Sequence, residues 1–414
     1  MRVTVLSTST TNVPPIVDPL GDVPDVQLVK IFYDKMAPDM LPRLLARSRP
    51  DWVLYVGALP GHHDGYVPST SELAQIGSRW PLCHICFDGA EPLWWPTLQE
   101  YYDSARFALM VNIDGVRIGP VGDRGFTTLA PVDARLYTNK QYSERPISCG
   151  FSGGLHAGRE MVIAPLVQRW LLTYRERDAV GDHALYRAYL DMCRSGINCA
   201  TTGGNTGALH VKHRALELAA AGCLVLEPKG SPLADWFAPG EDYIEYDGVD
   251  NATDCIHWVR RHLDEAEDMA QRMRAKVVER HSPRVFWSQV LARLGFGEPL
   301  VPPPEAPWRW WPGPPGLSAE PAIMLPPPIP PPAIPLLHVS VPQAPRAKLA
   351  KIFDHNVPFL LNSIRGHNLV QWRNRVYSVP QALGDIEIDK VDLRRFASVK
   401  VYSDLVAARQ AVLR

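Results

Sequence analysis

Two cations and a carboxylate occur close together near the start of a predicted helix in the second half of the chain. Lys212 and Arg214 stand two residues apart, and Glu217 follows within one to two turns. A helix N-terminus carries partial positive charge and free N–H groups, so adjacent Lys and Arg side chains complete a site for an anion such as a diphosphate. At its position Glu217 could accept hydrogen bonds from both hydroxyls of a ribose. The alternative is a solvated Lys/Arg pair beside a surface glutamate.

A second candidate for chemistry is the run Cys83-His84-Ile85-Cys86, which has half the spacing of a zinc site. No second Cys pair or His pair at a usable spacing accompanies it, and it lies within an apolar stretch that ends at Phe87. We therefore interpret it as small buried cysteines on a strand. The chain has 7 cysteines, scattered and odd in number, which fits a reducing compartment better than a disulfide framework.

Composition and charge narrow the class of protein. Lys+Arg number 43 and Asp+Glu 44, which gives a formal net charge of -1. Proteins that hold nucleic acid mainly through its phosphates usually carry a concentrated basic surface, so this balance argues against that class. No stretch approaches the roughly 18 uninterrupted apolar residues of a membrane helix. Residues 1–7 are too short an apolar segment for a signal peptide. We expect a cytoplasmic protein with no membrane span.

The elements that must position these residues alternate between strands and helices. Short apolar runs separated by helical patterns are typical of a parallel sheet with crossover helices. The alternation of strands and helices starts again after Pro146, which predicts two successive α/β halves over 1–145 and 146–298. Paired Rossmann-like domains bind ligands in the cleft at the carboxyl ends of their strands. The predicted strands are 2–6, 51–57, 81–87, 105–112, 147–151, 197–200, 223–227 and 243–246, and the predicted helices lie within 26–48, from about 155 to 177, and over 212–221 and 254–280.

Proline marks the clearest boundary along the chain. Residues 301–345 contain 17 prolines in 45 positions. Such a run removes backbone donors and favours extended polyproline II, so 299–345 is predicted to be a spacer. The alternative is a docking ligand for an aromatic groove. Beyond it, 346–414 is predicted to be a small α+β module, with a hairpin from 368–372 and 375–379 and a final helix over 404–413.

The run around Lys212 resembles the donor-binding region of GT-B glycosyltransferases of the group 1 type, in particular the branch of spore-maturation and spore-coat glycosyltransferases. The similarity continues from Ser231 to Tyr243 and along the predicted long helix to Ser282; it covers about residues 147 to 295. It implies an α/β fold with two Rossmann-like domains facing across a cleft (GT-B), followed by the proline-rich linker and the α+β module. It also implies transfer of a sugar from a nucleotide-diphosphate donor to an acceptor hydroxyl.

The resemblance assigns roles to the charged residues of the first paragraph. Glu217 matches the glutamate that holds the donor ribose, and Lys212 and Arg214 match the basic pair that faces the pyrophosphate. One departure concerns the sugar. The group 1 pattern carries a second acidic residue eight positions before the ribose glutamate, and this chain has Leu209 there. We therefore expect the sugar to be contacted differently, and retaining stereochemistry does not follow from the pattern.

The resemblance also implies loops that close over the donor. Gly153 and Gly154, after the strand 147–151, match the glycine loop that approaches the donor phosphates, with Arg159 as a weaker candidate for the same role. Ser231 and Leu233 fall in the loop that lies over the donor phosphates and sugar.

The first half is expected to bind the acceptor and to supply a general base. An inverting transferase needs one Asp, Glu or His to take a proton from the attacking hydroxyl. Asp88 follows the strand that ends at Phe87, and His62 follows the strand that ends near Gly57, so both are candidates. The alternatives are a helix N-cap for Asp88 and a polar loop for 62–64. No convincing Asp-x-Asp pair follows a strand in the first 298 residues. We expect that Lys and Arg replace a metal and that no metal is obligatory.

Three classes of function stay open at this point. They are the glycosyltransferase, a sugar-nucleotide epimerase on the same two-domain plan, and a non-catalytic binding module assembled through the linker and tail. The sequence leaves open the nucleotide, the sugar and the acceptor, which could be a protein, a glycan, a lipid or a nucleic acid. The tail, through 367–370 and 379–384, is similar to short modules appended to some bacterial sugar-modifying enzymes. Recruitment of the acceptor is our hypothesis for it.

Overall fold

The computed structural model describes residues 1–9, 14–56, 66–118, 124–155, 158–175, 183–202, 207–302, 359–364, 367–372, 375–380, 398–402 and 411. The chain forms two compact units, Met1–Ile323 and Met324–Arg414. From residue 303 on, the predicted linker lies outside the described residues, as does the predicted helix 404–413 apart from residue 411. Within the described part of the chain, no helix is both long enough and apolar enough to cross a membrane.

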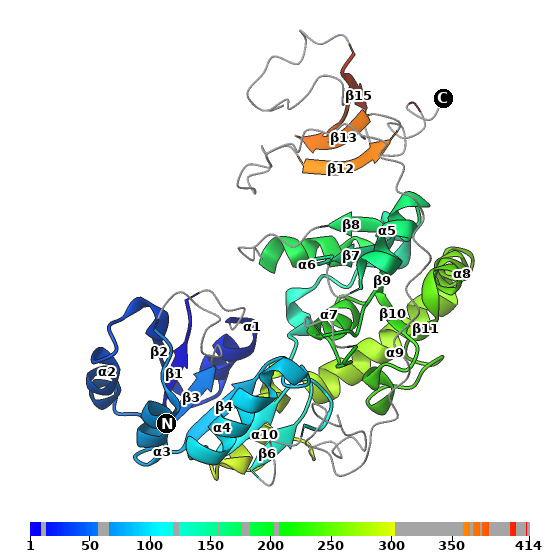
Figure 1. The fold of residues 1–414 in the computed structure, drawn as a ribbon. Coiled ribbons are helices and arrows are strands. Elements are labelled where there is room, and N and C mark those ends of the chain that lie inside the picture. The colour runs from blue at the N-terminus through cyan, green and yellow to red at the C-terminus, as the bar shows by residue number, and fades with distance from the viewer. Residues whose placement is uncertain are drawn as a thin grey trace, which may run out of the picture. The chain divides into compact units, whose positions relative to one another are not determined.

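The first unit contains two parallel β-sheets, one in each half (Figure 1). The first sheet has the strand order β2-β1-β3-β4-β5-β6, and each neighbouring pair is parallel. The predicted strands of this half are confirmed, although the last one begins only at Leu109. The helix predicted within 26–48 is confirmed in the last part of that segment, which also forms edge strand β2, a strand that was not predicted. The strands are β1 (Arg2–Ser7), β2 (Gln27–Phe32), β3 (Trp52–Val56), β4 (Leu82–Cys86), β5 (Leu109–Asn112) and β6 (Gly125–Thr127).

Helices cover both faces of this sheet, as the alternation along β3 requires. Val53 and Tyr55 lie in the core beneath α2, α3 and α4. Trp52 and Leu54 point to the opposite face, where they lie in one core with α1 and with α10, a helix from the far end of the unit. The helices are α1 (Pro14–Val17), α2 (Met40–Ser48), α3 (Thr70–Gly77), α4 (Trp95–Ser104) and α10 (Pro283–Arg293).

The second sheet has the order β11-β10-β9-β7-β8, again all parallel. Strand β9 starts four residues before its predicted position. Its residues Arg194, Ser195 and Gly196 form no apolar run, so the start of the strand carries no apolar signal. Close packing accounts for the glycine, because a Cβ on Gly196 would run into Leu218. The strands are β7 (Ile147–Ser152), β8 (Thr173–Arg175), β9 (Cys193–Ile197), β10 (Leu224–Pro228) and β11 (Ile244–Tyr246).

Two predicted helices of the second half are wrong in length. The helix predicted to reach about 177 ends at Gln168; Trp170 then takes a left-handed backbone with φ of 61° and the chain turns into β8. The helix predicted over 254–280 is two helices, because His262 leaves the helical conformation and stacks its ring on Trp258, with centroids 4.9 Å apart. The helices are α5 (Glu160–Gln168), α6 (His183–Asp191), α7 (His213–Ala220), α8 (Gly248–Arg261) and α9 (Leu263–His281).

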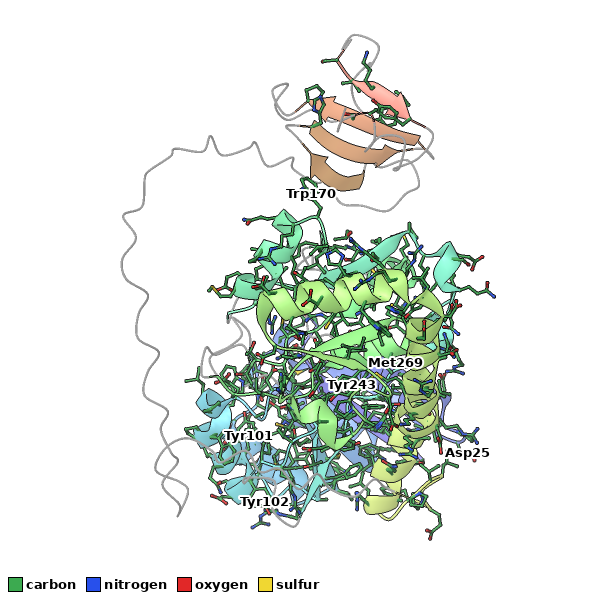
Figure 2. The ribbon with its side chains drawn as sticks, turned by 90° about the vertical axis from the view of Figure 1, so that its right-hand side faces the viewer. Asp25, Tyr101, Tyr102, Trp170, Tyr243 and Met269 are labelled. Atoms are coloured by element: carbon green, nitrogen blue, oxygen red, sulfur yellow. The ribbon has the colours of Figure 1, made fainter. Side chains whose placement is uncertain are left out.

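Each half has a core of closely packed side chains (Figure 2). Tyr101 of α4 belongs to that of the first half, and Tyr243 and Met269 belong to those of the second. Hydrogen bonds also join the halves: the indole of Trp236 donates to the carbonyl of Gly115 at 2.8 Å. The two sheets are thereby held against each other near the carboxyl ends of their strands.

The second unit contains one antiparallel sheet with the order β12-β13-β14-β15. The predicted hairpin is confirmed as β13 and β14, which pair from His367↔Pro380 to Trp372↔Arg375. The strands are β12 (Phe359–Ile364), β13 (His367–Trp372), β14 (Arg375–Pro380) and β15 (Lys400–Tyr402).

Candidate functional site

A cavity of about 300 Å³ lies where the two halves of the first unit meet. Side chains reach it from the segments that follow β4, β5 and β7, from α6, and from the segment that leads into α7. Ligands of paired parallel sheets bind at such carboxyl ends of strands. The polar and charged residues that line it are Asp88, Asp114, Ser152, Arg159, His183, Tyr186, His210, Lys212, His213, Arg214 and Glu217.

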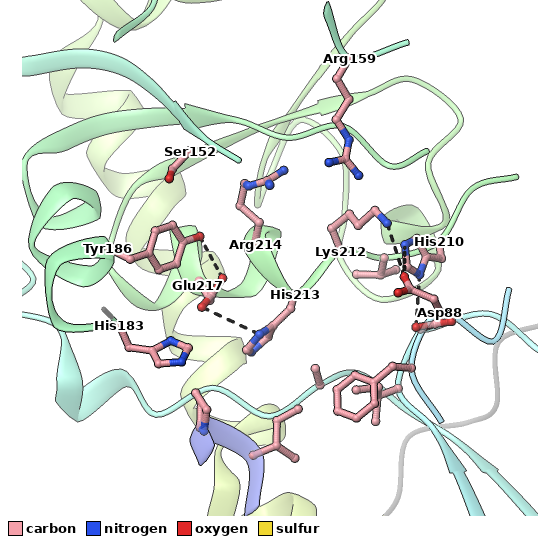
Figure 3. A pocket seen from close by; sticks show the side chains of 17 residues that line it. Asp88, Ser152, Arg159, His183, Tyr186, His210, Lys212, His213, Arg214 and Glu217 are labelled. Carbon is pink, nitrogen blue, oxygen red and sulfur yellow. Dashed lines mark hydrogen bonds and ion pairs between the residues drawn. The ribbon is translucent and has the colours of Figure 1, made fainter. Parts of the chain in front are cut away.

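Three cations point towards the middle of this cavity (Figure 3). Lys212 is the N-cap residue of α7, Arg214 lies in the first turn of that helix, and Arg159 immediately precedes α5. Burial lowers the pKa of Lys212, and burial together with the nearby Arg214 lowers the pKa of Arg159. Cations that are buried beside one another in this way are stabilised by an anionic ligand, because it restores the favourable interactions that water no longer supplies.

Gly153 lies next to the guanidinium of Arg214, and its lack of a side chain makes room for that group. A Cβ at this residue would meet the guanidinium of Arg214, and its φ of 152° is one that other residues rarely adopt. The guanidinium lies 4.5 Å above the ring of Phe151 and donates to the side chain of Asn198 at 3.4 Å. The carbonyl of Gly154 accepts a hydrogen bond from Arg159 at 3.5 Å. The predicted glycine loop therefore lies against two of the cations, although neither glycine lines the cavity.

Glu217 stands at one end of the cavity, among other polar side chains. Its carboxylate accepts a hydrogen bond from the hydroxyl of Tyr186 at 2.9 Å, and its other oxygen lies 3.9 Å from Nδ1 of His213. The carboxylate is thus held in place while it lines the cavity. This arrangement can receive hydroxyl groups of a ligand whose anionic part lies on the cations.

Asp88 stands at the other end of the cavity, beyond the cations (Figure 3). It is 55% exposed, and its Oδ1 lies 3.8 Å from Nζ of Lys212 and 3.6 Å from Nε2 of His210. The alternative of a helix N-cap is wrong, because Glu91 caps the short helix that follows. His62, the other candidate base, lies outside the described residues, as does the polar loop 62–64.

Besides the two glycines, two further residues predicted to bind the donor do not line the cavity. Ser231 is fully buried, and its hydroxyl donates to Glu227 at 2.6 Å and accepts from the amide of Leu233 at 3.2 Å. Leu233 is a fully buried member of the core around α7. Leu209, which replaces the acidic residue of the group 1 pattern, is also absent from the lining residues.

The sequence analysis missed His210 and Asp114, which both line the cavity. His210 is 4% exposed and its Nδ1 lies 3.2 Å from Oδ1 of Asp114, a residue that is itself 5% exposed. Asp114 follows β5 much as Asp88 follows the neighbouring β4. Polar residues after adjacent strands of a parallel sheet meet at one edge, and this signal could have identified Asp114.

The Cys83–Cys86 run belongs to the core, as predicted. Both cysteines are buried on β4, and burial lowers the pKa of His84 to about 3. The imidazole lies between aromatic rings, with centroids 5.4 Å from Tyr55 and 5.1 Å from Phe107. Within the part of the chain that the structure describes, no group of three or more His, Cys, Asp or Glu residues is arranged to hold a metal ion.

The chain was compared with protein families, with curated proteins and with solved structures. Residues 157–292 match the model of a family described as glycosyl transferase-like. A comparison with curated proteins finds no match. The crystal structure of Anabaena Alr3699/HepE in complex with UDP and glucose is 12% identical, with a TM-score of 0.50 over 71% of this chain and 99% of that chain.

A second similar structure is an alpha-glucosyltransferase in complex with UDP-glucose and DNA containing an abasic site. It is 10% identical, with a TM-score of 0.51 over 71% of this chain and 99% of that chain. The comparisons do not confirm the spore-coat branch. The first unit has the paired parallel sheets of the GT-B fold, and the match over its second half marks the chain as an enzyme of the glycosyltransferase type.

Proposed function

We propose that this chain transfers a sugar from a nucleoside-diphosphate donor to an acceptor hydroxyl in the cavity between its two sheets. The observation that carries the proposal is the order of side chains along the cavity. Lys212, Arg214 and Arg159 occupy its middle, with Glu217 at one end and Asp88 at the other. A nucleotide sugar has the same order, since its diphosphate lies between a ribose and the transferred sugar.

The donor is proposed to lie with its ribose at Glu217, its diphosphate on the cations and its sugar towards Asp88. Charge-assisted hydrogen bonds from Lys and Arg to phosphate are among the strongest that a protein forms. One structural neighbour is in complex with UDP and glucose, and the other is in complex with UDP-glucose. UDP is therefore the first nucleotide to test.

In the transfer step Asp88 is proposed to take the proton of the acceptor hydroxyl, as a general base. The acceptor oxygen forms a bond to the anomeric carbon while the bond from that carbon to the diphosphate breaks. The departing electron pair stays on the diphosphate, whose added charge the three cations stabilise. We propose that these cations make a metal unnecessary. Direct attack by one base-activated acceptor predicts inversion at the anomeric carbon.

The place of action and the acceptor are proposed more broadly. All seven cysteines are buried and free, which supports a cytoplasmic protein. One structural neighbour is bound to DNA, but the formal net charge of -1 favours an acceptor other than a nucleic acid.

The test is a thermal-shift panel with UDP, GDP, dTDP, ADP and CMP, without added metal. A ligand at a hundred times its dissociation constant stabilises a protein by roughly 2.7 kcal/mol. We expect one nucleotide to raise the Tm of the unaltered chain and of the Lys30→Ala control, whose lysine is paired with Asp18 and does not line the cavity. Lys212→Ala and Glu217→Ala should lose that shift. No shift with any nucleotide would contradict the proposal.

The bound sugar nucleotide also separates the three classes of function. A transferase slowly cleaves its donor to free sugar and nucleotide in the absence of acceptor. An epimerase isomerises the sugar nucleotide without cleaving it, and a binding module leaves it unchanged. Chromatography of the reaction mixture distinguishes these outcomes.

A further inference from the structure

His210 lies between two carboxylates that belong to the other half of the unit. Its Nδ1 is 3.2 Å from Oδ1 of Asp114, and its Nε2 is 3.6 Å from Oδ1 of Asp88. The imidazole precedes α7 in the second half, while both carboxylates follow strands of the first half. The three side chains form a line from a buried carboxylate, through a buried ring, to a carboxylate that faces the cavity.

The buried end of this line is fixed and charged. Oδ2 of Asp114 accepts a hydrogen bond from the amide of Ala90 at 3.0 Å, and its own amide donates to Asn112 at 3.2 Å. Burial raises the pKa of the Asp114 carboxyl, but the contact with His210 and the hydrogen bonds outweigh it, so the pKa is lowered overall. Asp114 therefore stays ionised despite its burial.

The imidazole is fixed through the backbone on both sides. The amide of His210 donates to the carbonyl of Ala200 at 3.0 Å, and the amide of Val211 donates to the carbonyl of Asp114 at 2.9 Å. The ring can face two carboxylates favourably only when both of its nitrogens carry protons. In that state Asp88, Asp114, His210 and Lys212 have no net charge between them.

At the exposed end of the line, one carboxylate oxygen of Asp88 contacts other side chains. Oδ1 of Asp88 faces both His210 and Lys212, so Oδ2 is the oxygen left to meet an acceptor. Asp88 also has a left-handed backbone with φ of 50°, an uncommon conformation for a residue other than glycine. Asp88 therefore has an unusual backbone conformation, and its side chain is oriented by the contacts with His210 and Lys212.

We propose that His210, held by Asp114, is a positioning residue that orients the Asp88 carboxylate towards the acceptor. This inference rests on the proposed function, in which Asp88 is the base. Neither nitrogen of His210 forms a hydrogen bond of good geometry within the described residues. Such contacts are often long without substrate and tighten when the site fills. Because His210 and Asp88 come from different halves, the base takes up its working orientation only while the halves are together.

The experiment measures the cleavage of UDP-glucose with water as acceptor, on the full chain. We expect His210→Ala to lower kcat roughly tenfold to a hundredfold, which is less than the roughly 10²–10⁴-fold that a general base itself contributes. Affinity for UDP should stay within about twofold, because the donor contacts are elsewhere. Imidazole added to the solution should restore part of the rate, since the removed ring lines the cavity. His262→Ala, which removes a ring that stacks on Trp258 and does not line the cavity, should cleave like the unaltered chain.

Asp114→Asn serves as a second variant, because it keeps the shape and removes the charge. It should also lower kcat while UDP affinity is retained. If both variants cleave UDP-glucose at the unaltered rate, the inference is overturned. It is also overturned if UDP affinity falls along with kcat and imidazole restores nothing, because that result describes general damage to the fold. If the unaltered chain binds no nucleotide and cleaves no donor, the proposed function itself fails.

Discussion

A single buried carboxyl group, that of Glu227 on β10, should make a contribution of its own to how stability depends on pH. It is fully buried and accepts hydrogen bonds from Asn198 at 2.8 Å and Ser231 at 2.6 Å. Burial nevertheless raises its pKa from 4.5 to about 7. Between these values the unfolded chain loses the proton and the folded chain keeps it. The contribution of Glu227 to the free energy of unfolding should therefore fall, on the order of 3 kcal/mol, as the pH rises through this window. The buried imidazoles of His84 and His281, whose pKa values burial lowers to about 3 and about 4, contribute in the opposite direction.

Glu227→Gln, which imitates the protonated carboxyl, should remove this decline, so that the variant becomes more stable relative to the unaltered chain as the pH approaches 7.5. Urea unfolding at a series of pH values measures it. Glu241→Gln, at an exposed position, is the control and should follow the unaltered chain. The same pH dependence of unfolding in both variants would show that Glu227 makes no such contribution.

At the scale of residues, the sequence revealed part of the site. Lys212, Arg214 and Glu217 could be predicted together because they lie on one helix start, where local spacing fixes their neighbourhood. His210 and Asp114 could not be paired in this way, because their contact depends on how the two sheets face each other. Ser231 looked like a ligand contact, but its hydroxyl is used within the fold.

At the scale of elements, the turn between α7 and β10 depends on Gly222. This residue has a φ of 72°, and a Cβ on it would press against the side chain of Asn139. We expect Gly222→Ala to cost about 1–2 kcal/mol for the left-handed backbone and about 1–3 kcal/mol more for the overlap.

The matched control for this turn is Gly240→Ala. Gly240 has a φ of 79° with nothing within 4 Å of the added Cβ, so only the backbone cost applies. Thermal unfolding should therefore show a larger loss of Tm for Gly222→Ala than for the control. Equal losses would mean that Asn139 moves away without cost.

Buried strands could be predicted because continuous apolar runs mark them, and every predicted strand has a counterpart near its predicted position. Strands β6 and β8, which lie at sheet edges, were not predicted. Edge strand β2 was not predicted, since its half-exposed residues mix with those of the following helix. The break at His262 was also missed. Both helices around it keep an apolar face, and the interruption comes from one side chain stacking on Trp258. Periodicity cannot reveal such local competition.

At the scale of the whole first unit, α10 joins the end of the unit to its beginning. Trp287 is fully buried beside the first sheet, and its indole donates to the carbonyl of Ile16 at 2.9 Å. We expect Trp287→Ala to lower the free energy of unfolding by about 3–5 kcal/mol. Hydrogen exchange should become faster in β1 and β3, which share this core.

Trp170→Ala is the control for the loss of a tryptophan. Its side chain is 46% exposed and lies outside the core clusters. Its unfolding free energy should change far less than that of Trp287→Ala. A similar loss in both would contradict the role of α10 in the first sheet. The amphipathic pattern of residues 283–293 does not say which sheet they cover, so this packing could not be predicted from the sequence.

The return of α10 also has a consequence for synthesis on the ribosome. The strands of the first sheet are complete by residue 127, yet one of their faces is covered in part by side chains from 283–293. Those residues emerge roughly 150 positions later, which at about 5–20 residues per second leaves the face open for on the order of 10–30 s. During this interval the nascent chain exposes an apolar surface that chaperones recognise. A chain released before residue 293 would keep that surface exposed.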